Sequence, residues 1–168
     1  DWPWGEDIVA YDNARLPQAL ILAGRFTGND RMKNLGLEAL DWLMEIQSAG
    51  SGHFRPVGSN GFLLRGGQAA LHDQQPLEAA ASVGACIEAF NATGDPRWKH
   101  AAQRAFEWFL GANDLRLSLY DHETGGCRDG LHESRANRNQ GAESTLSFLL
   151  ARAEIQTLHT AAPAVCLL

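Results

Sequence analysis

The sequence predicts an all-α protein, arranged as a partial (α/α) toroid of helical hairpins, about half of a six-hairpin barrel, with long glycine-rich loops. Three observations predict this fold. One segment is repeated along the chain, apolar residues recur at helical spacing in both copies, and the helices that precede the copies carry almost no charge. We expect residues 1–155 to form this domain and residues 156–168 to form a C-terminal tail.

An internal repeat is the first of these observations. Residues 27–42 align without a gap on residues 93–108, and both copies begin with Thr-Gly and end with Trp. In each copy the glycine suits the left-handed position that ends a helix, while Asn29 or Asp95 can cap the helix that follows. Each copy therefore predicts two helices joined by a tight turn.

The apolar patterns predict two classes of helix. After each tight turn, apolar residues fall on one face only, which predicts amphipathic helices. The helices before the turns, over residues 16–23 and 77–90, and a later helix over residues 146–151 are apolar on all sides, which predicts that they are buried. Alternating buried and amphipathic helices are typical of the inner and outer helices of a toroid.

Composition and charge exclude several classes of partner. The net charge of −6 and the scattered basic residues disfavour nucleic acid. The chain lacks an apolar run of roughly 20 residues and its N-terminus lacks a signal-peptide pattern, so we expect no membrane span and a cytoplasmic location. The three cysteines are far apart and the histidines lack metal-ligand spacing, so we expect no metal and no cofactor.

Each buried helix begins with a cluster of polar residues, within residues 11–17, 72–78 and 137–145. If the hairpins stack around one axis, these clusters meet at one opening, and the two long loops over residues 48–72 and 111–138 surround it. We expect the catalytic candidates to be four carboxylates: Asp12, Asp73, Glu78 and Glu143. The residues expected to bind substrate are Trp4, Tyr11, Asn13, Arg15, His53, Gln74, Gln75, Tyr120, Asp121, Asp129, Asn139 and Gln140.

Helix capping is the alternative role for Asp12, Asp73 and Asn139, because Asp and Asn are favoured at helix N-termini. Capping accounts for one such residue per helix. It does not account for the glutamines, for Arg15, or for carboxylates a turn deeper in apolar helices. Carboxylates, amides and aromatic rings together suit a carbohydrate, whose hydroxyls need donors and acceptors and whose apolar face stacks on rings.

Several segments carry a resemblance to a known family. They are Trp2-Pro-Trp-Gly-Glu-Asp, Tyr11-Asp-Asn-Ala-Arg-Leu-Pro, Asp73-Gln-Gln-Pro-Leu-Glu-Ala, Leu119-Tyr-Asp-His-Glu-Thr-Gly-Gly-Cys and Asn139-Gln-Gly-Ala-Glu-Ser-Thr. Up to about Glu154 the chain resembles the C-terminal helical region, of the six-hairpin glycosidase type, found in bacterial proteins with a glycosyltransferase domain.

This resemblance implies an (α/α) toroid that acts on or holds carbohydrate, and an N-terminal glycosyltransferase domain as a further partner. A complete toroid of this type has about twelve helices, whereas the sequence predicts five, so the chain resembles the C-terminal half of one.

Two functions remain open. The first is a glycoside-processing enzyme, or a fragment of one, in which one carboxylate donates a proton and another acts as base or nucleophile. The second is a non-catalytic glycan-binding or scaffolding module attached to a glycosyltransferase. Two carboxylates facing each other across a pocket would favour the enzyme, whereas carboxylates occupied by caps or arginines would favour the module. A helical adaptor for other proteins is a third possibility, which the polar clusters disfavour.

Overall fold

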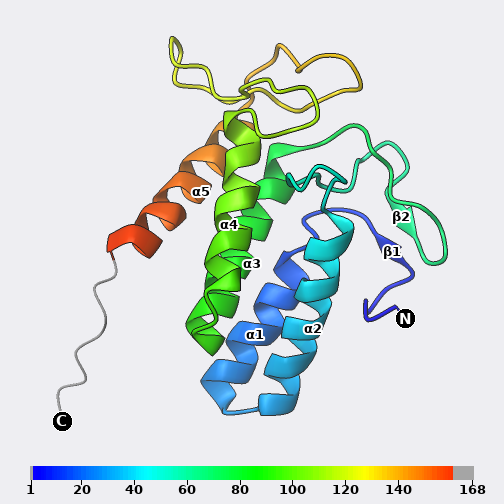
Figure 1. Ribbon diagram of the computed structural model, residues 1–168, viewed down its shortest axis with the longest axis vertical. Helices are drawn as coiled ribbons and strands as arrows, with labels where there is room; N and C mark the ends of the chain where they lie inside the picture. Colours follow the sequence, from blue (N-terminus) through cyan, green and yellow to red (C-terminus); the bar gives the residue numbers. More distant parts are fainter. Residues whose placement is uncertain (1, 161–168) are drawn as a thin grey trace.

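Two helical hairpins dominate the fold, which is known from a computed structural model that describes residues 2–160 (Figure 1). Helices α1 (Arg15–Thr27) and α2 (Asp30–Ile46) form the first hairpin, and α3 (Pro76–Thr93) and α4 (Arg97–Glu107) form the second. The expected all-α class is confirmed.

The remaining elements are one long helix, a 3-10 turn and two short strands. A 3-10 turn, η1 (Trp108–Leu110), continues α4, and α5 (Ala142–Thr160) follows the second long loop. The short antiparallel strands β1 (Ile8–Val9) and β2 (Leu63–Leu64) join the N-terminal segment to the first long loop. The expected division between residues 155 and 156 falls inside α5, and most of the expected tail, residues 161–168, lies outside the described residues.

Both tight turns begin with a left-handed glycine. Gly28 and Gly94 have φ angles of 67° and 71°, in the region where glycine is favoured. Asn29 caps α2, because its Oδ1 accepts a hydrogen bond from the backbone N–H of Met32 at 3.1 Å. In the second copy Pro96 is the N-cap residue of α4 and no side chain caps the helix, although Asp95 Oδ1 accepts from the backbone N–H of Arg97 at 2.9 Å. The predictions of a repeated hairpin and of a cap at Asn29 are confirmed, whereas the predicted cap at Asp95 is wrong.

Helix α3 lies at the centre of the molecule, because α1 packs along one side of it and α5 along another, while α4 covers it from the second hairpin (Figure 1). Nearly every residue of α3 up to Ala89 is buried, as the sequence predicts. For α1 and α5 the prediction of burial on all sides is wrong. Among the described residues each packs on α3 along one side, and each leaves leucines exposed, such as Leu20 and Leu149.

Aromatic side chains fill the core between the second hairpin and α5. Trp108 and Phe109 are fully buried, and Phe109 and Phe148 meet edge to face with their ring centroids 5.5 Å apart. Cys86 and Cys127 are buried as well, and burial raises the pKa of each thiol to about 12. These cysteines are therefore packing residues, as expected for Cys86.

Candidate binding site

The beginnings of α1, α3 and α5 lie together at one end of the molecule. The hydroxyl of Tyr11, just before α1, donates a hydrogen bond to Glu143 Oε2, in the first turn of α5, at 3.1 Å. Glu78, in the first turn of α3, accepts hydrogen bonds from the segment that leads into α1. The three polar clusters that are separate in the sequence thus become neighbours. We call Tyr11, Asp12, Asn13, Arg15, Glu78 and Glu143 the helix-start cluster.

Glu78 connects α3 to the entrance of α1. Its carboxylate accepts from the backbone N–H groups of Asp12, at 2.6 Å, and Asn13, at 3.1 Å, and from Asn13 Nδ2 at 3.0 Å. Burial raises the pKa of Glu78 to about 7, although these hydrogen bonds act in the opposite direction. Glu78 therefore holds the segment before α1 against α3, and its oxygens face the protein's own N–H groups.

Asp12 occupies the most unusual position in the helix-start cluster. It has a φ angle of 51°, and its Oδ1 atom is buried without a hydrogen bond of ordinary geometry among residues 2–160. The same oxygen forms an ion pair with Arg15 Nε at 3.5 Å. Burial raises the pKa of Asp12, Arg15 lowers it, and the charge of Glu143 raises it further. The helix that follows has Ala14 at its N-cap and no side-chain cap, so the capping role considered for Asp12 is wrong.

Asp73 lies at the start of α3 and pairs with a histidine of the second long loop. His132 Nδ1 and Asp73 Oδ1 are 2.5 Å apart. A carboxylate on one ring nitrogen of a histidine fixes the orientation and tautomer of the ring. Asp73 does not cap α3, because Gln75 is the N-cap residue and makes no side-chain cap hydrogen bond. The pair holds the two long loops together, next to the backbone bonds between Gln74 and Leu131.

Gln74 and His53, both expected to bind substrate, instead hold the loops in place around Asp114. Gln74 is buried, its Nε2 donates to Asp114 Oδ2 at 2.6 Å, and its Oε1 accepts from Trp108 Nε1 at 2.8 Å. His53 Nε2 and Arg55 also contact Asp114. Although burial raises the pKa of Asp114, these hydrogen bonds hold it below its usual value. In the sequence, Asp114 comes shortly after the end of the second amphipathic helix. No pattern of residues around it predicts this network.

The other expected binding residues lie away from the helix-start cluster or are engaged in loop contacts. Trp4 is buried, and its Nε1 donates to the carbonyl of Ile8 at 3.0 Å, so its ring belongs to the packing. The ring of Tyr120 stacks on Phe148, with centroids 4.4 Å apart. Four polar residues between η1 and α5 bond to one another in two pairs: Gln140 with Asp121, and Asn139 with Asp129.

The sequence predicted Asn139 as a possible cap of the last helix. In the structure it is Asp129 that bonds to the backbone at the start of α5. Asp129 Oδ1 accepts from the backbone N–H of Gly141 at 2.6 Å, immediately before α5. Burial raises the pKa of Asp129, but hydrogen bonds from Asn139 and Gly141 hold this pKa below its usual value. The second loop is thus closed onto the start of α5 by its own side chains.

A polar group that sequence reasoning missed lies farther along α1 and α5. Arg15 Nη1 donates to Gln18 Oε1 at 2.8 Å. A Cβ atom on Gly84 of α3 would lie 3.1 Å from Gln18 and from Glu154 and 3.2 Å from Arg15, so all three side chains gather over this glycine. Burial raises the pKa of Glu154, and Arg15 opposes that shift. Polar residues in otherwise apolar helices were the signal that could have identified Gln18 and Glu154.

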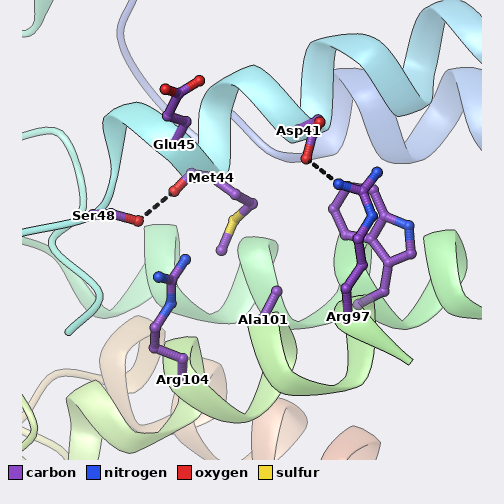
Figure 2. A pocket seen from close by; sticks show the side chains of 8 residues that line it. Asp41, Met44, Glu45, Ser48, Arg97, Ala101 and Arg104 are labelled. Atoms are coloured by element: carbon purple, nitrogen blue, oxygen red, sulfur yellow. Dashed lines mark hydrogen bonds and ion pairs between the residues drawn. The ribbon is translucent and has the colours of Figure 1, made fainter. Parts of the chain in front are cut away.

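A separate groove of about 370 Å³ lies between α2 and α4 (Figure 2). Arg97 reaches across it to Asp41, with Nη1 and Oδ1 2.7 Å apart, and Arg104 lies farther along the same helix (Figure 2). Its lining includes none of the residues that the sequence predicted for the site. This groove is a seam between the two hairpins.

Comparison with known proteins adds no family to this description, because no family model matches the chain and no curated protein matches it. Within the part of the chain that the structure describes, no three His, Cys, Asp or Glu side chains are placed to hold a metal ion. No helix among the described residues is long and apolar enough to cross a membrane.

Proposed function

We propose that this chain binds carbohydrate at the helix-start cluster, as part of an (α/α) toroid in which α1, α3 and α5 are inner helices. The convergence of their polar beginnings supports this arrangement, because a toroid brings the same end of each inner helix to one opening. Arg15, Tyr11 and Glu143 together offer the donors and acceptors that sugar hydroxyls require. The glycosyltransferase partner, bacterial origin and cytoplasmic location that we expect from the sequence remain predictions.

The observation that carries the proposal is the polar surface that Asp12 shares with Arg15 and Tyr11. Asp12 Oδ1 is buried against Arg15 Nε, 3.5 Å away, while 35% of the Asp12 side chain and 39% of the Arg15 side chain stay exposed. A sugar hydroxyl at this place can donate to the exposed part of the Asp12 side chain and accept from Arg15. Tyr11 lies beside Asp12 in the sequence and is 56% exposed, so its ring is accessible to the apolar face of a sugar.

Binding without catalysis is the function that Glu78 favours. Glu78 is engaged inside the protein by three N–H groups, whereas Asp73 has one oxygen paired with His132 and a side chain that is 42% exposed. A carboxylate whose two oxygens are both occupied, as in Glu78, is poorly placed to donate or accept a proton on a substrate.

A glycoside-processing activity is the second candidate, and Asp12 and Glu143 favour it. The pKa of Asp12 is raised by burial first and by the charge of Glu143 as well. A carboxyl group with a raised pKa is suited to donate a proton, and a nearby exposed carboxylate is suited to act as base or nucleophile. In this mechanism Asp12 is the acid and Glu143 the second carboxylate.

A glycan array probed with the full chain, followed by calorimetric titration of the glycans that bind, tests the proposal. Asp12→Asn is expected to weaken binding by about tenfold or more, because the charged acceptor for the hydroxyl is lost. Glu38→Gln, on an exposed position of α2, is the matched control and should leave binding unchanged. An array without a bound glycan, or equal affinities for Asp12→Asn and the unaltered protein, would overturn the proposal.

Incubation of the bound glycans with the protein separates the two candidates. Release of sugar that is lost in Glu143→Gln establishes glycoside processing. Binding without release establishes the non-catalytic module.

A further inference from the structure

Helix α3 has no side chain at Gly84, and polar side chains of the two neighbouring helices cover this position. Gln18 Nε2 of α1 and Glu154 Oε2 of α5 would lie 3.1 Å, and Arg15 Nη1 3.2 Å, from a Cβ atom placed on Gly84. We call Arg15, Gln18 and Glu154 the Gly84 cluster. Charged and amide groups thus meet over the middle of an apolar helix, where core packing would place apolar side chains.

The Gly84 cluster leaves a donor and an acceptor without a protein partner. Arg15 Nη1 donates to Gln18 Oε1 at 2.8 Å. Within residues 2–160, however, the amide nitrogen of Gln18 donates no hydrogen bond and the carboxylate of Glu154 accepts none. A hydroxyl group of a ligand can accept from the Gln18 amide and donate to the Glu154 carboxylate.

The Gly84 cluster continues the helix-start cluster along the molecule. Arg15 belongs to both, because its Nε pairs with Asp12 Oδ1 at 3.5 Å while its Nη1 contacts Gln18. On α5, Glu154 follows Glu143 by eleven residues, which is about three helical turns, so both lie on the same side of α5 and roughly 16 Å apart along its axis. A single sugar ring cannot contact both ends of this span, whereas linked sugars can.

We propose that the Gly84 cluster is a second sugar subsite, and that the carbohydrate bound by this chain is an oligosaccharide extending from the helix-start cluster to Glu154. This inference rests on the proposed carbohydrate binding and adds the length of the ligand to it. The three side chains of the Gly84 cluster are half-buried, so a ligand can reach them. The glycine is part of the subsite, because a methyl group at this position would displace their polar ends.

Calorimetric titration of the full chain tests the length of the ligand. The two probes are the longest glycan that binds on the array and the methyl glycoside of its terminal sugar. The glycan should bind at least tenfold more tightly. Glu154→Gln should weaken binding of the glycan by about tenfold, because the charged acceptor is lost, and should leave binding of the methyl glycoside unchanged. Glu38→Gln, the matched control on α2, should bind both probes as the unaltered protein does.

Gly84→Ala separates a role in binding from a role in packing. Alanine is favoured over glycine inside a helix, and the atoms that its methyl group would meet are the ends of flexible side chains. The melting temperature should therefore be equal or higher, while displacement of Gln18 and Glu154 should weaken binding of the glycan by about tenfold.

The results distinguish this inference from the proposal on which it rests. Equal affinities for the glycan and the methyl glycoside would overturn the second subsite and leave binding at the helix-start cluster intact. Unchanged glycan affinity in Glu154→Gln, or an equal loss of affinity for both probes, would overturn it as well. An array without a bound glycan would overturn both proposals.

Discussion

The hairpins α1–α2 and α3–α4 share a turn and a sequence pattern but differ in what covers their first helix. When the repeat is extended along the chain, Leu16 and Leu20 of α1 correspond to Ser82 and Cys86 of α3. The two leucines are 50% and 36% exposed, whereas Ser82 and Cys86 are fully buried. The larger apolar side chains are thus on the less covered helix.

This difference shows that burial in a repeat is decided by the neighbours of each copy. Among residues 2–160, helix α3 packs against α1, α4 and α5, whereas α1 packs mainly against α2 and α3. The paired tryptophans show the same effect. Trp108 is fully buried and donates to Gln74, while Trp42 is half-buried and packs on the N-terminal rings of Trp2 and Trp4.

The largest expected effect comes from truncating these two tryptophans. Trp108→Ala should lower the free energy of unfolding by about 3–5 kcal/mol, because it leaves a cavity in the core and removes the donor to Gln74. Trp42→Ala should cost about 2 kcal/mol, since part of its ring is already in water. Urea denaturation of both variants measures the two losses of unfolding free energy. Equal losses would show that the two tryptophans are buried to the same extent.

A somewhat smaller effect concerns the pH dependence of stability. The pKa of Glu78 is about 7 in the folded protein and 4.5 ordinarily, so between these values the folded chain keeps a proton that the unfolded chain releases. The free energy of unfolding contributed by Glu78 therefore falls as the pH rises through this window, by about 3 kcal/mol in all. Glu78→Gln should remove this slope.

Urea denaturation at several pH values between 4 and 8 tests the Glu78 prediction. The difference in stability between Glu78→Gln and the unaltered protein should change across the window, while Glu38→Gln should follow the unaltered protein at every pH. Parallel curves for Glu78→Gln and the unaltered protein would contradict the prediction.

The smallest expected effect is the one that the two hairpins share. Gly28→Ala and Gly94→Ala should each cost about 1 kcal/mol, because both glycines have positive φ angles that an alanine adopts with strain. Apart from its chain neighbours, a Cβ atom at either position would meet no atom of residues 2–160 within 4 Å, so backbone conformation alone determines the cost. Thermal unfolding should show equal shifts for the two variants; a clear inequality would mean that the turns are not equivalent.

The repeated hairpin could be predicted because its signals are local. The turn glycines, the cap at Asn29 and the apolar spacing depend on residues a few positions apart. The burial of α1 and α5 could not be predicted, since a helix with two apolar faces has the same sequence pattern whether one face or both are covered. The pairing of β1 with β2 was also missed, because strands of two residues carry no periodic signal.

For the candidate site, the sequence predicted which helix beginnings meet but not what each side chain does there. Asp12, Glu78 and Glu143 come together as expected. Their separate roles depend on the direction of individual oxygens: those of Glu78 face backbone N–H groups, while Oδ1 of Asp12 faces Arg15 Nε. Such directions follow from the packing of α1 on α3, which no pattern along the chain encodes.

The contact between Glu78 and the entrance of α1 also sets an order of events during synthesis. Glu78 is separated by 65 residues from Asn13, whose backbone it holds. During synthesis the segment that leads into α1 leaves the ribosome before α3 does. Its hydrogen bonds to Glu78 therefore form only after the first turn of α3 has emerged, although this segment precedes α3 in the chain.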